Sequence, residues 1–172
     1  KTLEQIEPRI IANALGGDVD AKVHISQPGN YYLIADIISV DNNKNGIKIT
    51  ADDVNLDLNG FVVASNVEVT SLDGILVDDD LTGITIRNGT IRDFQGDGVN
   101  CGGASAQCRL ERLNIFRNGD NGIEAGDGSI VLDCTMFDNG GFGLAAEGTL
   151  VHRCSFLNNT GGPMSSQYDN NF

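Results

Sequence analysis

The sequence predicts an all-β fold, a single-stranded right-handed parallel β-helix of about six coils with an N-terminal cap. The main observation is a repeat of six pairs, in each of which a Gly or Pro is followed directly by an apolar residue. The apolar members of these pairs are spaced by 28, 24, 24, 21 and 20 residues. A repeat of about 20 to 30 residues is typical of solenoids. The pairs are Gly46-Ile47, Gly74-Ile75, Gly98-Val99, Gly122-Ile123, Gly143-Leu144 and Pro163-Met164.

A second observation is the alternation of apolar and polar residues over short stretches, as in Ile84-Thr85-Ile86 and in residues 54–58. This period of two indicates strands, and Gly, Asn and Asp end each stretch after a few residues. A unit of about three short strands can bury its inward face only by stacking on the next unit, with strands about 4.8 Å apart. The handedness of parallel crossovers predicts a right-handed coil.

The repeat divides the chain into three parts. Residues 1–20 do not fit it, and their apolar residues follow approximately helical spacing until Gly16 and Gly17 stop the segment. We expect residues 1–20 to cap the N-terminal end, because an open solenoid end needs a cover. Residues 21–166 are expected to form the β-helix, and the polar residues 167–172 a C-terminal tail.

One polar column repeats with the coils. Asn118, Asn139 and Asn159 stand at the same place in three successive repeats. Asn tolerates the left-handed turn conformation, and its amide can hydrogen-bond an Asn above and below it. We therefore interpret the column as a structural ladder, in preference to a set of ligands.

The four cysteines, Cys101, Cys108, Cys134 and Cys154, fall near inward positions of the repeat. Cys134 and Cys154 occupy the same column on neighbouring turns, which favours free thiols packed as small apolar groups in the core. The alternative is a Cys101–Cys108 bridge across one turn. Their spacing lacks the close ligand pair that is typical of zinc sites.

Composition and charge limit the partners. A net charge of −13 and a pI near 4.2 argue against nucleic acid and anionic membranes. No apolar run reaches the length of a membrane span, so membrane insertion is not expected. The chain starts at Lys1 with no signal segment in view, so any export signal is expected to have been removed or left out.

Several segments resemble a known family: Glu-Pro-Arg at 7–9 and the stretches 25–33, 54–61 and 84–92. They are similar to the opening of bacterial right-handed parallel β-helix repeat proteins, which belong to the pectin-lyase-like superfamily. The resemblance covers most of the chain and implies the same fold. It also implies export to a secreted, cell-surface or periplasmic location. Proteins with this opening mostly have no assigned activity, so the resemblance implies little about chemistry.

The enzymes of that superfamily cleave or epimerise acidic polysaccharides, and most of their motifs are missing here. The sequence lacks the Asn-Thr-Asp, Gly-His-Gly and Arg-Ile-Lys segments of polygalacturonase-like sites. It also lacks the Asp-Pro-His-Asp segment of alginate epimerases. A cluster of carboxylates with an arginine base, as in pectate-lyase-like sites, is the remaining catalytic possibility.

An acidic turn is the nearest feature to such a site. The 28-residue offset between Ile49 and Val77 predicts that two aspartates lie one coil below three others. Stacked carboxylates suit Ca²⁺, and a solvated acidic turn is the simpler alternative. With calcium and an arginine base, this turn supports an alternative function as a polysaccharide lyase or epimerase acting on an acidic polysaccharide. The candidate calcium ligands are Asp52, Asp53, Asp78, Asp79 and Asp80.

The arginines have a structural interpretation as well as a catalytic one. Arg112, Asp133 and Arg153 share a column, with charges that alternate in sign from coil to coil. Such a column is expected to form an ion-pair ladder on the surface. We prefer this interpretation to an arginine that acts as a base or as a substrate clamp.

An apolar stripe is the most unusual outward feature. Phe116, Phe137 and Leu157 each follow an inward apolar residue, so alternation places them on the outside. The alternative is that each strand ends there and the side chain turns back over the corner. As a contact surface, the stripe predicts a homo-oligomer, for which we expect a trimer, and carbohydrate is the expected external ligand by analogy. The sequence therefore predicts a non-catalytic, exported structural or surface-recognition module.

Overall fold

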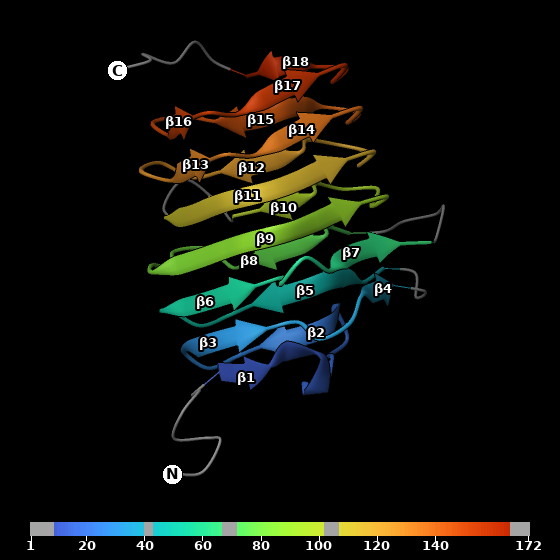
Figure 1. The fold of residues 1–172 in the computed structure, drawn as a ribbon, viewed down its shortest axis with the longest axis vertical. Coiled ribbons are helices and arrows are strands. Elements are labelled where there is room, and N and C mark those ends of the chain that lie inside the picture. The colour runs from blue at the N-terminus through green and yellow to red at the C-terminus, as the bar shows by residue number, and fades with distance from the viewer. Residues whose placement is uncertain (1–8, 40–42, 67–71, 102–106, 166–172) are drawn as a thin grey trace.

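The computed structural model describes residues 9–39, 43–66, 72–101 and 107–165, which coil into a rod of stacked turns (Figure 1). Neighbouring strands are parallel throughout these residues, and they belong to two sheets. The predicted all-β parallel β-helix of about six coils is confirmed. Each coil passes through the smaller sheet, turns, passes through the larger sheet and climbs to the next coil.

The larger sheet, sheet A, contains 11 strands and is divided lengthwise by a bend. Before the bend lie β1 (Arg9–Ile11), β3 (Gly29–Tyr32), β6 (Val54–Asp57), β13 (Ile130–Leu132) and β16 (Leu150–His152). Beyond the bend lie β4 (Ile37–Ser39), β7 (Val62–Ser65), β14 (Thr135–Phe137) and β17 (Ser155–Leu157). Two longer strands, β9 (Ile84–Arg92) and β11 (Cys108–Phe116), run through the bend and join the two halves.

The smaller sheet, sheet B, carries the glycine-led repeat of the sequence. Its seven strands are β2 (Ala21–Ile25), β5 (Asn45–Ile49), β8 (Ile75–Val77), β10 (Val99–Asn100), β12 (Ile123–Ala125), β15 (Phe142–Ala146) and β18 (Gly162–Met164). The repeat therefore marks the same strand in each coil. One earlier strand, β2, escapes the sequence pattern because Lys22 stands where the later coils have Gly or Pro.

The bend in sheet A is made by non-glycine residues in the left-handed conformation. Asn88, Arg112, Asp133 and Arg153 occupy it on successive coils, with φ of 60°, 51°, 54° and 51°. Asn and Asp reach this region at low cost, whereas Arg does so only where the surrounding strands hold it. The in-register pairing of β9 with β11 on both sides of Arg112 supplies that restraint.

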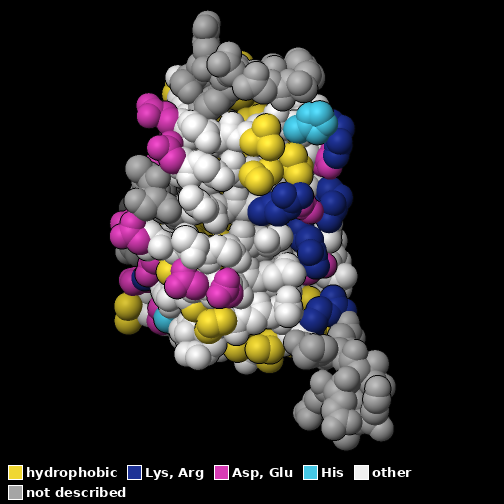
Figure 2. All heavy atoms as spheres, turned by 90° about the vertical axis from the view of Figure 1, so that its left-hand side faces the viewer, with side chains coloured by type: hydrophobic (Ala, Val, Ile, Leu, Met, Phe, Trp, Pro, Cys, Tyr) yellow, Lys and Arg dark blue, Asp and Glu magenta, His cyan; other side chains and the backbone are white. Residues whose placement is uncertain are grey.

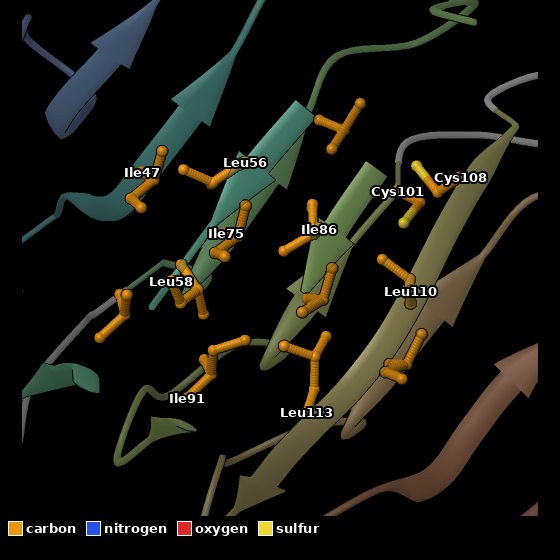
Figure 3. Packing of buried hydrophobic residues seen from close by; sticks show 14 of the residues in the cluster. Ile47, Leu56, Leu58, Ile75, Ile86, Ile91, Cys101, Cys108, Leu110 and Leu113 are labelled. Carbon is orange, nitrogen blue, oxygen red and sulfur yellow. The ribbon is translucent and has the colours of Figure 1, made fainter. Parts of the chain in front are cut away.

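The core is a set of vertical files of side chains between the two sheets. Val23, Ile47, Ile75, Val99 and Ile123 are paired in register up sheet B, and each is buried. Figure 3 shows apolar side chains of both sheets pointing into the same interior. In the last coil the inward side chains of β16 and β17 are only half-buried, because they lie at the end of the rod.

The N-terminal segment is not an α-helix in its described part. Its described part forms the edge strand β1 and one 3₁₀ turn, η1 (Ala12–Ala14), where the apolar spacing indicated a helix. The free edge of β3 explains the difference, because Arg9–Ile11 pair with Asn30–Tyr32. Ala12 is fully buried at this end of the core. Residues 1–8 and the tail 167–172 lie outside the described residues, in which no helix is long and apolar enough to cross a membrane.

Candidate functional site

An apolar stripe lies on the outer face of sheet A towards the C-terminal end. β11, β14 and β17 extend to Phe116, Phe137 and Leu157, which are paired in register on successive coils. The preceding residues point inwards, so these three side chains face outwards. The rings of Phe116 and Phe137 stack with centroids 4.6 Å apart and planes inclined by 15°. Leu157 is 61% exposed. We call these three residues the aromatic stripe.

A second apolar group lies on the other side of the bend. Ile130 and Leu132 take the outward positions of β13 and are half-buried, and Leu150 of β16 is 51% exposed. Figure 2 shows hydrophobic side chains gathered in the upper half of the rod, beside a vertical file of Lys and Arg. The outer face of sheet A is thus more apolar in its C-terminal coils than in its central coils, where Asn55, Asp57, Thr85 and Arg87 occupy the outward positions.

The seven arginines of the chain all lie on sheet A strands or on the turns that border them. Arg92 and Arg117 share the carboxylate of Asp93. Arg109 and Arg112 share Glu111 in the same way. Each trio has two positive charges and one negative charge, a net of +1, on a chain whose total charge is −13.

One arginine also contacts the aromatic stripe. The guanidinium of Arg117 lies over the ring of Phe116, with Cζ 4.9 Å from the centroid. Its Nε donates to Asp93 Oδ1 at 2.7 Å and its Nη2 donates to Asp93 Oδ2 at 3.0 Å. Burial would raise the pKa of Asp93, but the hydrogen bonds from Arg117 and Arg92 outweigh it and lower that pKa.

Of the predicted ladder of Arg112, Asp133 and Arg153, only the pair between Asp133 and Arg153 is formed. Arg153 donates to both carboxylate oxygens of Asp133, at 2.5 and 2.8 Å. Arg112 instead donates through Nε to Asn88 Oδ1 on the coil below, at 2.7 Å, and its Nη1 pairs with Glu111 of its own strand at 3.3 Å. The column itself is as the sequence indicated, but the long Arg112 side chain selects other partners.

Asn118, Asn139 and Asn159 form a column of side-chain hydrogen bonds, which we call the amide ladder. Asn118 Nδ2 donates to Asn139 Oδ1 at 3.1 Å, and Asn139 Nδ2 donates to Asn159 Oδ1 at 2.9 Å. The backbone N–H groups of Asn118 and Asn139 donate to the same two oxygens. Asn118 and Asn139 are buried. These amides satisfy one another and the neighbouring backbone, which is a structural role.

The candidate calcium ligands are not stacked as the sequence offset predicted. Ile49 does pair with Val77, but the turn that follows Val77 is two residues longer than the turn that follows Ile49. Asp52 and Asp53 therefore lie below Thr82 and Gly83, and Thr82 N donates to Asp52 Oδ1 at 2.7 Å.

The other three candidates, Asp78, Asp79 and Asp80, stand earlier in the longer turn. Asp78 pairs with Lys48, at 3.7 Å, and Asp80 has a φ of 62°. Among the residues that the structure describes, no group of three or more His, Cys, Asp or Glu side chains is arranged to hold a metal ion. The acidic turn is therefore spread along the surface, where water and Lys48 can screen its charges.

The four cysteines are free in the structure. Cys101 and Cys108 are buried, and their sulfurs lie close together in Figure 3. The hydrogen bond with Cys108, followed by burial, raises the pKa of Cys101 well above its ordinary value. Cys134 Sγ lies 3.2 Å from Leu132 O. Cys101, Cys108 and Cys134 are buried small core residues, whereas Cys154 is half-buried.

The structure contains a second column of side-chain hydrogen bonds, which the sequence analysis did not predict. Asn45, Asp73, Asp97 and Asn121 each directly precede a glycine of the repeat. Their Oδ1 atoms accept the backbone N–H of the corresponding residue one coil later, at 2.8 Å, 2.8 Å, 2.9 Å and 2.9 Å. We call this column the mixed ladder, and its two aspartates the acid pair. The recurring Asn-Gly and Asp-Gly dipeptides were the signal that could have revealed it.

The acid pair contains the carboxyls whose pKa is raised; every other shifted carboxyl of the described residues has a lowered pKa. Asp97 is only 4% exposed, and Asp73 is half-buried one coil below it. Burial, followed by the charge of Asp73, raises the pKa of Asp97 to about 7. Burial also raises the pKa of Asp73. The two carboxyls therefore differ from Asp93, whose pKa is lowered by its arginines.

Parallel strands that repeat coil after coil around one closed core define a solenoid of the β-helix class. The family model described as right handed beta helix region matches residues 23–172. The chain therefore belongs to the right-handed β-helix family, and this agrees with the resemblance to pectin-lyase-like proteins. No curated protein and no solved structure matches the chain. Any function beyond the fold has to be argued from the residues themselves.

Proposed function

We propose that this chain is a non-catalytic β-helix module that associates with further copies of itself through the aromatic stripe. The observation that carries the proposal is the outward stack of Phe116 and Phe137, continued by the exposed Leu157. Stacked apolar side chains on a polar, acidic rod remain in contact with water until another surface covers them. A second copy offers an equally apolar stripe.

The ring geometry favours an apolar contact over a platform for sugars. A sugar packs its C–H groups on the face of an aromatic ring. In Phe116 the ring faces are engaged, since the ring stacks on Phe137 and the Arg117 guanidinium lies over it. Stacked rings present their edges to solvent, and edges suit packing against aliphatic or aromatic side chains. Carbohydrate, the ligand expected by analogy, is therefore the less supported occupant.

Charge also favours this face for contact between copies. Two chains that each carry −13 repel one another, and the repulsion is smallest where positive charge gathers. Arg92 lies in register one coil below Phe116, and Arg117 touches the Phe116 ring. Salt screens the long-range repulsion, with a Debye length of about 10 Å at 0.1 M. Self-association is thus expected to strengthen as salt is raised.

The stripe is small, so the association is expected to be weak. A standard interface uses about 20 to 30 residues on each side, whereas the stripe contributes three. Dissociation constants in the micromolar range or above are expected. A trimer is the order that we propose, with a secreted, cell-surface or periplasmic location that rests on the family resemblance alone.

Sedimentation velocity over a wide concentration range tests the proposal. Wild type is expected to shift to a faster species as concentration and salt rise, and Phe137→Ser is expected to remain a monomer. Val19→Ser is the matched control, because Val19 is 83% exposed and lies near the opposite end of the rod. A wild-type monomer up to roughly 1 mM would remove the proposal.

Two further measurements test the remaining parts of the proposal. If wild type stays monomeric but is retarded by a polysaccharide in affinity electrophoresis, and Phe137→Ser is not, the stripe binds carbohydrate instead. The alternative of a calcium-assisted lyase is tested by the ultraviolet absorbance of unsaturated uronates, with and without Ca²⁺. A rise in absorbance with wild type would overturn the non-catalytic assignment. Product analysis by NMR covers epimerisation, which forms no new double bond.

A further inference from the structure

The mixed ladder needs only an oxygen acceptor at each level. Asn45 and Asn121, at its two ends, accept the N–H of the coil above with an uncharged amide oxygen. Asp73 and Asp97, in the middle, accept the same kind of bond at the same lengths. An asparagine at either position would make this bond without a charge. The two aspartates are therefore unnecessary for the backbone bonding of the turn.

The aspartates also carry an electrostatic cost. They occupy neighbouring coils of the same column, and within the described residues neither carboxylate forms an ion pair with Lys, Arg or His. Lys48, on β5 of the same sheet, is paired with Asp20 and Asp78 instead. Two stacked, largely dehydrated carboxylates cannot both be ionised without strong repulsion.

Two of the described groups that face the pair increase this repulsion. Asp120, in the turn before β12, and Glu124, on β12, add further negative charge, and both favour the protonated form of the pair. Cys101, after β10, is a buried thiol whose pKa is raised, so it stays neutral. Hydrogen bonds compensate in part: Asn100 of β10 donates its amide to Asp97 Oδ2 at 3.1 Å, and Asn121 N donates to Asp97 Oδ1 at 2.9 Å.

We propose that Asp73 and Asp97 together carry one proton at neutral pH and act as a pH-sensitive lock between the coils of β8 and β10. With the proton present, one carboxyl is neutral and the two coils stack without repulsion. When the proton is lost, two adjacent charges press the coils apart at the middle of the rod. The device is separate from the aromatic stripe and does not depend on self-association.

The sign of the pH effect follows from the direction of the shifts. Asp97 has a pKa of about 7 in the folded chain against an ordinary value of 3.8, so the folded state binds the proton more tightly. The stabilising effect is therefore full below 3.8 and is lost as the pH rises towards 7. Carboxyls with lowered pKa values, such as Asp57 and Asp93, stabilise the folded chain while they are ionised. Their stabilising effect is lost as the pH falls below about 4.

Urea unfolding between about pH 5 and pH 8 tests the lock. In wild type the unfolding equilibrium constant is expected to rise by roughly tenfold to a hundredfold across this range. In Asp97→Asn the rise is expected to fall to a few-fold. Asp127→Asn, which removes an exposed carboxylate from another turn, is the control and should retain the full wild-type rise. Equal pH slopes in wild type and Asp97→Asn would overturn the proposal.

Carboxyl carbon NMR on the wild-type chain gives a second readout that needs no variant. One carboxyl is expected to titrate near neutral pH, and its signal should be absent in Asp97→Asn or shifted in Asp73→Asn. If all carboxyls titrate below about pH 5, the pair does not hold a proton. If millimolar Ca²⁺ near pH 8 stabilises wild type but not Asp97→Asn, the pair binds a cation in place of the proton. That result would overturn the proposal of a pH-sensitive lock.

Discussion

The amide ladder and the mixed ladder lie three residues apart in the same turn, and they solve one problem with different side chains. In the amide ladder, Asn118 N donates to the Asn139 side chain on the coil above. In the mixed ladder, Asn121 N donates to the Asp97 side chain on the coil below. Each ladder therefore fixes the spacing of neighbouring coils through an oxygen that accepts a backbone N–H.

The second atom of each side chain explains why the residues differ. Asn139 Nδ2 faces two oxygens, Ile115 O at 3.3 Å and Asn159 Oδ1 at 2.9 Å, so this position requires a donor. Asp97 Oδ2 faces the amide of Asn100, which donates to it, so this position accepts a carboxylate. The comparison teaches that the polarity of the groups facing the second side-chain atom, more than burial, decides whether a ladder can include an acid.

The largest expected effect comes from Gly98, which follows Asp97 of the mixed ladder and lies against Asn118 of the amide ladder. A Cβ on Gly98 would lie 2.3 Å from the Ile115 side chain, 2.6 Å from Gly122 O and 2.8 Å from Asn118 Nδ2. Gly98→Ala is therefore expected to destabilise the chain by about 3 kcal/mol or more, measured by urea unfolding. Gly16→Ala, where a Cβ meets nothing within 4 Å, is the control. Equal losses of stability in the two variants would show that the ladders do not depend on the close approach of the neighbouring coils at Gly98.

A somewhat smaller effect is expected when the donor of the amide ladder is removed. Asn139→Asp places an oxygen opposite Ile115 O and Asn159 Oδ1, so we expect a loss of about 2 to 3 kcal/mol near pH 7. Asn158→Asp makes the same change at an exposed position one coil higher and should cost little. Thermal or urea unfolding of both variants measures the difference. If Asn139→Asp is as stable as its control, the distinction drawn between the ladders fails.

The smallest expected effect is the coupling within the acid pair. Either Asp73→Asn or Asp97→Asn removes the repulsion between the two carboxyls, so the second substitution should stabilise less than the first. A double-mutant cycle near pH 8 is expected to give a coupling of about 1 kcal/mol. Near pH 5, where the pair holds its proton, the coupling should shrink towards zero. Additive effects at both pH values would mean that the two aspartates do not interact.

The fold could be predicted from the sequence because its evidence is periodic. Ile47, Ile75, Val99 and Ile123 recur at nearly constant intervals, and inward positions tolerate only apolar residues. The column of Asn118, Asn139 and Asn159 could be aligned for the same reason, since the coils above Gly98 differ little in length. Periodic positions can be aligned without coordinates.

Features that depend on turn length or on side-chain direction could not be predicted in the same way. The two additional residues after Val77 moved Asp78–Asp80 out of register with Asp52 and Asp53. Arg112 keeps its column, but its long side chain reaches Asn88 on the coil below and Glu111 beside it on β11. The buried character of Asp97 depends on the packing of several turns, which no local pattern reports.

The short coils between Gly122 and Met164 have a consequence for the growth of the rod. Each of these coils meets only the one before and the one after it, and β12, β15 and β18 share one register. Copying a single such coil in the gene would lengthen the rod by one strand spacing, about 4.8 Å, and would leave every existing contact surface intact. The architecture can therefore serve as a molecular ruler whose length evolution adjusts in equal steps.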